Sequence, residues 1–295
     1  MRLLIICLLL PLLSIAQDEQ WWRNTVQWDG VSGYQKYISY TPRFMGPNAL
    51  PVPQTRNGII DSIHQLQVSV SAHHTPGDIT INPSLYGTYV LVPGIISFDA
   101  WYIPAEWYQS SHAIKTERHT YYWFYNDHWA QGDFQLYTNV QLLKPEKHRW
   151  AAVLRLGYRF PSSGGLGAAR CTDAPGYSID VNTGRYINEN HSLRWKLMLG
   201  FYNWQMGNLV QQQNDALLAG TGLEWRKKQH KLDLSITGYW GYLTIKGDDP
   251  VVLRLSYETQ WKRSKAFLRL QQGFFDNQFL SAEAGMGWLF RNTKR

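Results

Sequence analysis

Residues 149–160 read RWAAVLRLGYRF, and this stretch decides the fold. Every second position is apolar from Trp150 to Phe160, whereas the intervening positions include Arg155 and Arg159. Successive side chains of a β-strand point to opposite faces of the sheet. The stretch therefore predicts a strand with one apolar face and one charged face.

The same alternation recurs in nine segments that together run from residue 133 to residue 290. They are 133–143, 149–160, 176–187, 192–204, 214–226, 231–243, 251–262, 266–275 and 279–290. We expect the apolar phase to be free of charge and to face lipid, and the other phase to face a wet lumen. The predicted lumen-facing charges are Arg155, Arg159, Asp180, Arg194, Lys196, Glu224, Arg226, Asp233, Arg254, Glu258, Arg269 and Glu283.

Segment length and turn spacing indicate how these strands are joined. Segments of about 10 to 12 residues match strands that cross a bilayer at a tilt. Tight polar turns alternate with connections that are mostly longer, which is typical of an up-and-down barrel. A soluble β-sandwich would explain the two-faced strands, but its strands average only about five or six residues.

Tryptophan positions favour the barrel over the sandwich. Five tryptophans share the apolar phase and lie near tight turns or near the C-terminus, where they predict an aromatic girdle at one membrane interface. They are Trp150, Trp195, Trp225, Trp261 and Trp288.

The strand count depends on the first 130 residues. Residues 119–125 read as a tenth strand, residues 65–73 as another, and 79–107 as one or more strands that Pro83, Pro93 and Pro104 interrupt. Single-chain bacterial barrels have even strand numbers, so we expect an all-β transmembrane antiparallel barrel of 12 strands, with 14 as the alternative.

The N-terminus reads as a targeting segment followed by a segment without strand periodicity. Residues 1–16 combine Arg2, an apolar run and the small-residue pattern Ser14-Ile15-Ala16, which predicts a signal peptide. Residues 17–60 are rich in proline and aromatic residues, and could lie in the lumen, line the periplasmic rim or be mobile. The remaining divisions are a barrel over 61–290 and a basic tail over 291–295.

Charge and cysteine content narrow the classes of partner. The formal net charge is +7, but the cations gather in short segments between strands, which favours turns near anionic headgroups over nucleic-acid binding. With Cys7 inside the predicted signal peptide, Cys171 has no partner for a disulfide within the chain.

The residues together resemble a known class. The signal sequence, the alternating strands and the ending Met286-Gly287-Trp288-Leu289-Phe290 resemble Gram-negative outer-membrane β-barrel proteins, and the Tyr/Trp-rich strands are similar to uncharacterised barrels of Bacteroidota. The resemblance implies an outer-membrane location after signal-peptide cleavage. It also implies contact with membrane lipid and with the barrel-assembly machinery through the last strand. One departure is that residues 291–295 follow the final aromatic residue.

Several functions fit such a barrel. The lumen charges predict either a structural network or a narrow channel for small polar or anionic solutes. A scaffold could instead bind other envelope proteins through Trp21, Trp22 and Trp28. A barrel hydrolase would use Asp127, His128 and Asp133 as acid and base groups. We expect no cofactor, and no metal site at the scattered histidines His73, His74, His112, His119 and His128.

Overall fold

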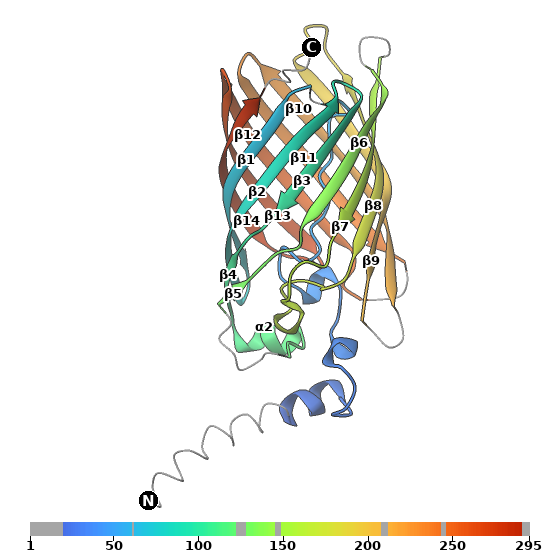
Figure 1. The fold of residues 1–295 in the computed structure, drawn as a ribbon, viewed down its shortest axis with the longest axis vertical. Helices are drawn as coiled ribbons and strands as arrows, with labels where there is room; N and C mark the ends of the chain where they lie inside the picture. The colour runs from blue at the N-terminus through green and yellow to red at the C-terminus, as the bar shows by residue number, and fades with distance from the viewer. Residues whose placement is uncertain are drawn as a thin grey trace, which may run out of the picture.

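The protein is described by a computed structural model over residues 20–60, 62–121, 128–144, 149–207, 212–242 and 246–290. Fourteen strand segments form one antiparallel sheet, in which β1 pairs with both β14 and β2 and so closes a barrel (Figure 1). The segments are β1 (His64–Thr75), β2 (Asp78–Val92), β3 (Ile96–Tyr102), β4 (Glu106–Ser110), β5 (Trp129–Ala130), β6 (Gln135–Leu143), β7 (Ala151–Arg159), β8 (Gly176–Tyr186), β9 (Leu193–Gln205), β10 (Gln213–Lys227), β11 (His230–Gly241), β12 (Pro250–Trp261), β13 (Ser264–Phe275) and β14 (Leu280–Phe290).

Two pairs of segments each act as one interrupted strand. Both β3 and β4 pair with β2. The ladder with β3 ends at Leu85 of β2, and the ladder with β4 ends at Ile81 of β2. Pro83 lies between these ladders and Pro104 lies between β3 and β4, where neither can donate a backbone N–H. Because β6 pairs with β3 and β5 with β4, the same break continues into the next strand. The barrel thus has twelve strands, which confirms the predicted number.

The route to twelve strands differs from the predicted one in one place. All nine predicted segments after residue 130 coincide with β6 to β14, and the predicted strand at 65–73 is β1. The prediction for 119–125 is wrong over residues 119–121, which form a turn and coil after helix α2 (His112–Glu117). Ser111 caps that helix by accepting a bond from the Ile114 N–H, at 3.3 Å. Residues 122–125 lie outside the described residues.

The two ends of the barrel differ. At one end, here called the turn rim, short connections such as 228–229 and 262–263 join the strands, and β14 ends there (Figure 1). At the other end, called the loop rim, lie α2 and longer connections such as 160–175. The two-residue turn between β1 and β2 and the connection 276–279 are short ones at the loop rim.

The outer surface of the wall is apolar. Leu199, Leu217 and Leu268 are 69%, 61% and 59% exposed, and all three lie on the outward phase. The expectation of a completely charge-free outer face is wrong at Arg185 and Asp215, which also lie on the outward phase. Both are close to strand ends, where a charge can reach the membrane interface. Arg185 lies over the ring of Trp150, 5.9 Å from its centroid.

The five predicted girdle tryptophans lie near the turn rim. Trp195, Trp225, Trp261 and Trp288 are between 38% and 46% exposed on the outward phase. Trp150, just before β7, contacts Trp195 with ring centroids 5.7 Å apart.

Residues 40–60, here called the lumen segment, run inside the barrel from the loop rim to the turn rim (Figure 1). A short 3-10 helix, η1 (Tyr34–Tyr37), precedes the segment, and a second, η2 (Pro42–Phe44), lies at its start. Residues 20–26 are helical. A third 3-10 helix, η3 (Leu166–Ala168), lies in the connection between β7 and β8. Among the described residues, none of the helices has the length and apolar character needed to cross a bilayer.

The hydrophobic core lies inside the barrel, in its loop-rim half. Part of the cluster comes from residues that precede the barrel or belong to the connection around η3, and part from inward-facing wall residues. Its members include Ile38, Tyr40, Met45, Leu50, Val52, Leu166, Met198, Tyr202, Trp204, Leu218 and Tyr239. The lumen segment therefore replaces solvent on this part of the inner wall.

Candidate functional site

The lumen is the candidate site, because it gathers the charged residues that alternation placed on the inner face. All twelve predicted lumen charges lie on the inward phase of their strands. Most lie within 4 Å of an opposite charge, either on a neighbouring strand or, for Lys196 and Asp233, two strands apart, as expected where charges are shielded from water. The pairs include Arg155 with Asp180 at 3.0 Å, Arg269 with Glu283 at 2.6 Å, and Lys196 with Asp233; Glu258 pairs with Lys231 and Lys265.

Three of the predicted lumen charges differ from this pattern. Arg226 is at the turn rim, where its side chain is 57% exposed and 3.6 Å from Glu224. Arg194 and Arg254 are buried, yet neither forms an ion pair with any residue that the structure describes. Two guanidinium nitrogens of Arg194 and one of Arg254 also have no hydrogen-bond partner among the described residues. These two arginines are therefore buried cations without an ion-pair partner among the described residues.

Side chains from several strands hold the lumen segment by its backbone. Arg159 donates to the carbonyl of Ala49 at 2.6 Å, and Arg254 donates to that of Val52 at 2.6 Å. Further along the segment, the Gln54 carbonyl accepts a hydrogen bond from Arg155 at 3.2 Å. Among the described residues, the side-chain donors to carbonyls of the segment include Trp204 to Tyr40, Arg159 to Ala49, Tyr239 to Leu50, Arg254 to Val52, Arg155 to Gln54, Lys196 to Thr55 and Gln141 to Gly58.

Gly58 allows the segment to pass close to the wall at the turn rim. Its φ of +77° is in the left-handed region that favours glycine. A Cβ at this position would lie 2.7 Å from the carbonyl oxygen of Ala151 and 2.9 Å from the amide nitrogen of Gly184. No other residue type fits here without displacement of backbone.

A buried polar network closes the loop-rim end of the lumen. Arg170, in the connection after η3, contacts Glu106 and Asp78, each at 2.6 Å, and Arg118 contacts the same Asp78 carboxylate. Burial opposes the charge on Arg170, but the carboxylates of Glu106 and Asp78 raise the pKa of its guanidinium above the usual value. Asn48 of the lumen segment donates to Glu106, so the segment belongs to this network, here called the latch.

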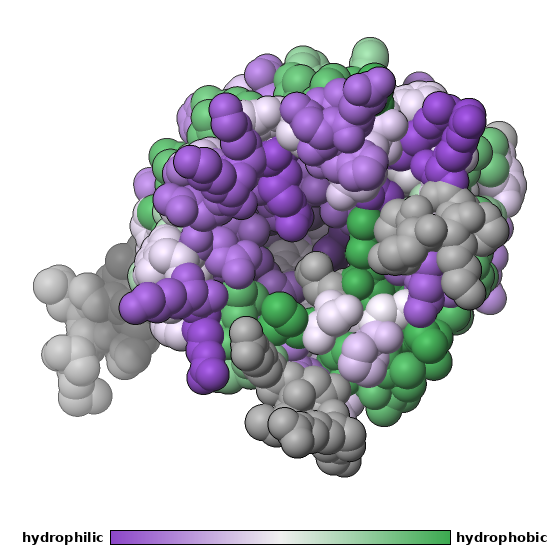
Figure 2. All heavy atoms as spheres, turned by 90° about the horizontal axis from the view of Figure 1, so that it is seen from above, coloured by the Kyte–Doolittle hydropathy of each residue, from purple (hydrophilic) through white to green (hydrophobic). Residues whose placement is uncertain are grey.

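The two halves of the lumen differ in hydration. Figure 2 views the barrel from the turn rim, which is hollowed at its centre and has hydrophilic residues around much of the opening. Below this opening the side chains of Arg269 and Lys231 are 23% and 25% exposed, whereas Arg155, against the lumen segment, is 3% exposed. The lumen is thus a polar vestibule that opens at the turn rim and is filled toward the loop rim.

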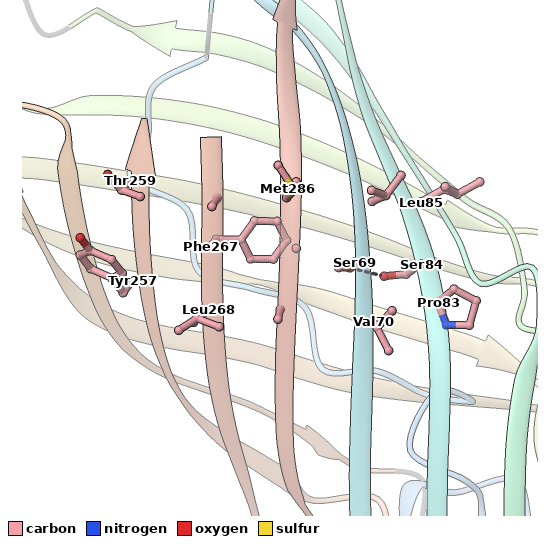
Figure 3. Close-up of a pocket in the computed structure, with 14 residues that line it drawn as sticks. Ser69, Val70, Pro83, Ser84, Leu85, Tyr257, Thr259, Phe267, Leu268 and Met286 are labelled. Atoms are coloured by element: carbon pink, nitrogen blue, oxygen red, sulfur yellow. Dashed lines mark hydrogen bonds between the residues drawn. The ribbon is translucent and has the colours of Figure 1, made fainter. Parts of the chain in front are cut away.

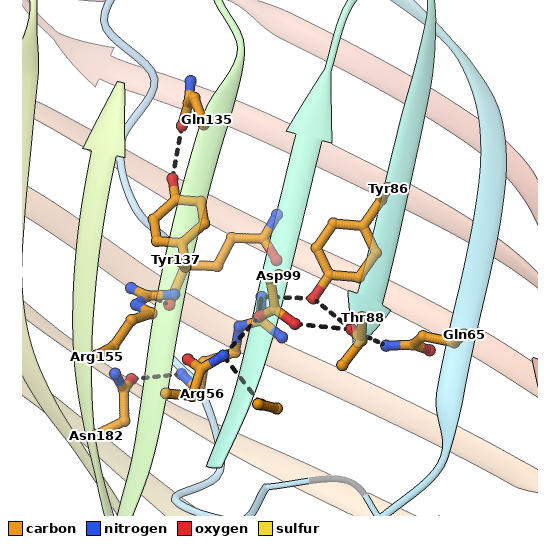
Figure 4. Close-up of polar contacts among 12 residues, drawn as sticks. Arg56, Gln65, Tyr86, Thr88, Asp99, Gln135, Tyr137, Arg155 and Asn182 are labelled. Carbon is orange, nitrogen blue, oxygen red and sulfur yellow. Dashed lines mark hydrogen bonds and ion pairs between the residues drawn. The ribbon is translucent and has the colours of Figure 1, made fainter. Parts of the chain in front are cut away.

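Figure 4 shows how the wall meets the lumen segment at the edge of this vestibule. Asp99 on β3 accepts from Thr88 at 2.7 Å and from Asn139 at 3.1 Å, and it lies 3.4 Å from Arg56 of the segment. Asn182 on β8 accepts from the Arg56 backbone N–H at 2.6 Å. The segment is held by side chains on both sides at this level.

Sequence reasoning missed several members of this site. Alternation did not assign the inward residues of β2 to β4, and Arg118 and Arg170 lie in connections, where no periodicity applies. The missed residues are Asp78, Asp99, Glu106, Arg118 and Arg170.

The residues considered for hydrolysis do not form a catalytic arrangement where the structure describes them. Asp133 is buried and accepts bonds from the N–H groups of Ser162 and Ser163, while Arg159 lies 3.4 Å away. His128 is exposed. Asp127 lies outside the described residues.

The histidines and the cysteine are also placed apart from one another. His73 faces inward and is buried, His74 faces outward, and within the described ranges no cluster of three or more metal-ligating residues occurs. Cys171 is buried and donates to Asp173 at 3.0 Å. Burial, and then the negative charge of Asp173, raise the pKa of this thiol far above its usual value.

A groove of about 730 Å³ lies on the barrel wall over β1, β2 and β12 to β14 (Figure 3). It is lined mainly by outward-facing side chains, among them Val70, Leu85, Leu268 and Met286. The side chains of Ala266 and Ala284 are small, so the surface is depressed at these positions. It belongs to the apolar exterior and not to the charged lumen.

Comparisons with known proteins support the fold. Comparison with protein-family models and with curated proteins gives no match. The structure is similar to an outer membrane channel from Pseudomonas putida F1, with 8% identity, a TM-score of 0.58, and coverage of 82% of this chain and 100% of that chain. It is also similar to the NanC porin, with 8% identity, a TM-score of 0.53, and coverage of 76% and 98%.

At such low identity these similarities show the fold alone. The chain is a closed antiparallel barrel of twelve strands, apolar outside and charged inside, with the architecture of outer-membrane β-barrels.

Proposed function

We propose that the protein is an outer-membrane channel for small polar or anionic solutes, and that its own lumen segment closes it. The observation that carries this proposal is the set of bonds from Arg155, Arg159, Lys196 and Arg254 to backbone carbonyls of residues 49–55. These wall cations are thus satisfied by main-chain carbonyls of residues 49–55, a stretch without a charged side chain. When the segment leaves, each of them loses an acceptor that an anion or water must replace.

The balance of charge supports a preference for anions. Arg155 and Lys196 would keep their wall carboxylates after displacement of the segment. Arg254 has no such partner among the described residues, and neither does Arg194. An open lumen would therefore present unpaired cations to solutes, and rings of cationic side chains select anions in pores.

Location and orientation are part of the same proposal. The predicted signal peptide over residues 1–16, which lies outside the described residues, would direct export, and the apolar wall would contact outer-membrane lipid. We place the turn rim in the periplasm, since short turns lie on that side in bacterial barrels. The final strand β14 would then offer its end to the assembly machinery.

One observation favours the scaffold alternative. The apolar cluster inside the loop-rim half is packed like the core of a soluble domain, with Trp204 and Tyr239 completely buried. A permanently filled barrel would have the same interior.

A reversible lock separates the two functions. Thr55 of the lumen segment and Thr237 of β11 have side-chain oxygens 2.8 Å apart, which makes this pair our choice for an engineered disulfide. In a Cys171→Ser background, we expect Thr55→Cys with Thr237→Cys to form a bridge that holds the segment in the lumen. In a planar bilayer the oxidised protein should carry no current, and a reductant should restore opening events.

Deletion of residues 33–60 provides the complementary test. The variant should conduct steadily, and Arg254→Gln in this background should reduce its preference for anions. Arg226→Gln, which removes the same charge from an exposed position at the turn rim, should reduce it less because bulk solvent already screens that charge. If neither the reduced double variant nor a folded deletion variant carries current, the channel function is wrong and the scaffold remains.

A further inference from the structure

The two ends of the described chain lie at opposite ends of the barrel. His64 at the start of β1 pairs with Phe290 at the end of β14, so the barrel begins and ends at the turn rim. The lumen segment reaches that rim from inside, and its other end at Tyr40 is fixed at the loop rim by the indole N–H of Trp204, at 2.7 Å. Figure 1 shows residues 20–39 beyond the barrel at the end opposite that where β14 ends.

The length of the lumen segment fits a single passage. Strands of about twelve residues, at about 3.3 Å per residue and tilted by about 40°, give a wall roughly 30 Å high. Residues 40 to 58 could span at most about 60 Å if fully extended, so the passage accommodates the turn at η2 as well. The ordered bonds from Tyr40 to Gly58 show that the segment does not fold back to the loop rim.

Residues 20–39 are docked on the loop rim by aromatic contacts. Trp22 is 2% exposed, and its indole N–H donates to the carbonyl of His119 at 3.0 Å. Its ring makes edge contacts with Trp28 and with Tyr121, at centroid distances of 5.4 and 5.2 Å. Tyr34 stacks on Tyr121 at 4.3 Å. Residues 20–39, with the loop residues they contact, form what we call the N-terminal module.

We infer that the barrel carries its own N-terminus through its lumen and presents the N-terminal module on the opposite side of the membrane from the C-terminus. With the turn rim in the periplasm, the module is a surface on the outside of the cell. This inference rests on the membrane placement in the proposed function, but not on conduction. It adds a further crossing of the membrane to the twelve strands of the wall.

Three single cysteines, each in a Cys171→Ser background, test the inference. Val31→Cys reports on the N-terminal module, because Val31 is 91% exposed. Gly164→Cys reports on the loop rim, where a Cβ meets nothing within 4 Å. Arg263→Cys reports on the turn rim, at an exposed position between β12 and β13.

The probe is a membrane-impermeant maleimide, applied to intact cells and then to lysed cells. On intact cells, the cysteine at position 31 should show the same reactivity as the one at position 164, and the one at position 263 should show the opposite reactivity. After lysis all three should react. This comparison holds whichever rim faces outward. If position 31 instead reacts together with position 263, the threaded topology is wrong while the membrane barrel stands. If all three react equally on intact cells, the membrane placement fails, and with it both proposals.

Discussion

An arginine at the middle of the outer wall should destabilise the barrel much more than the same residue at its turn rim. Leu199 is the central residue of β9, and Ile187 lies at the turn rim, where its N–H bonds the carbonyl of Leu193. They are 69% and 59% exposed on the outward phase, so substitution removes little packing at either position. Leu199 lies six positions after Leu193, which is about 20 Å along the strand and about 15 Å along the membrane normal at a tilt of about 40°. This distance is half of a hydrocarbon core of about 30 Å.

The expected costs follow from that depth. Leu199→Arg should lower the free energy of unfolding by about 2 to 4 kcal/mol, and Ile187→Arg by about 0 to 1 kcal/mol. Equilibrium urea titration in phosphatidylcholine vesicles, followed by tryptophan fluorescence in both directions, measures both values. Gln67→Arg, at a half-buried inward position of β1, is the control for a charge facing the lumen. If the Leu199 and Ile187 variants lose equal stability, the outer wall is not in contact with lipid and the membrane placement is refuted.

Three further predictions concern the interior. Arg170→Ala should cost about 3 to 5 kcal/mol of stability, because it leaves the buried carboxylate of Glu106 without its cation and removes one of the two arginines from Asp78. Arg43→Ala, in an exposed ion pair, should cost about 1 kcal/mol or less, and equal losses in urea titration would contradict the latch. Gly46→Val should loosen the lumen segment and raise the frequency of opening in bilayers, because its Cβ would lie 2.7 Å from the Arg170 guanidinium carbon. The control Gly164→Val, at a position with open space around it, should leave the frequency of opening unchanged. Cys171 should resist alkylation at pH 8 in the folded protein and react after unfolding, as measured by mass spectrometry, because burial raises its pKa; rapid labelling of folded protein would show that the loop opens.

The wall could be predicted from the sequence because lipid on one side and water or charge on the other impose a period of two on every strand. Arg155 and Arg159, set between Trp150 and Phe160, already define the two faces of β7. The same constraint does not apply in the connections. Residues 119–121 show the limit, since a run of strand-forming residues follows a capped helix and forms a turn instead.

The filling of the lumen could have been suspected from the wall residues. In β9 the inward phase reads Arg194 and Lys196 near the turn rim but Met198, Tyr202 and Trp204 toward the loop rim. Large apolar side chains on an inner face need something to cover them. The identity of the cover did not follow from this pattern, because residues 40–60 have neither strand nor helix periodicity.

The bonds that hold the lumen segment end on main-chain oxygens, and every residue type has one. The wall donors therefore depend on the spacing and extension of the segment, while its buried side chains, such as Met45, Leu50 and Val52, contribute separately by packing in the core. Pro51 and Pro53 maintain the extended path, and Gly58 permits the close passage at the end. A related chain could change half-buried side chains of this stretch, such as that of Gln54, and keep every one of these main-chain bonds, whereas the buried ones must still fill the same space.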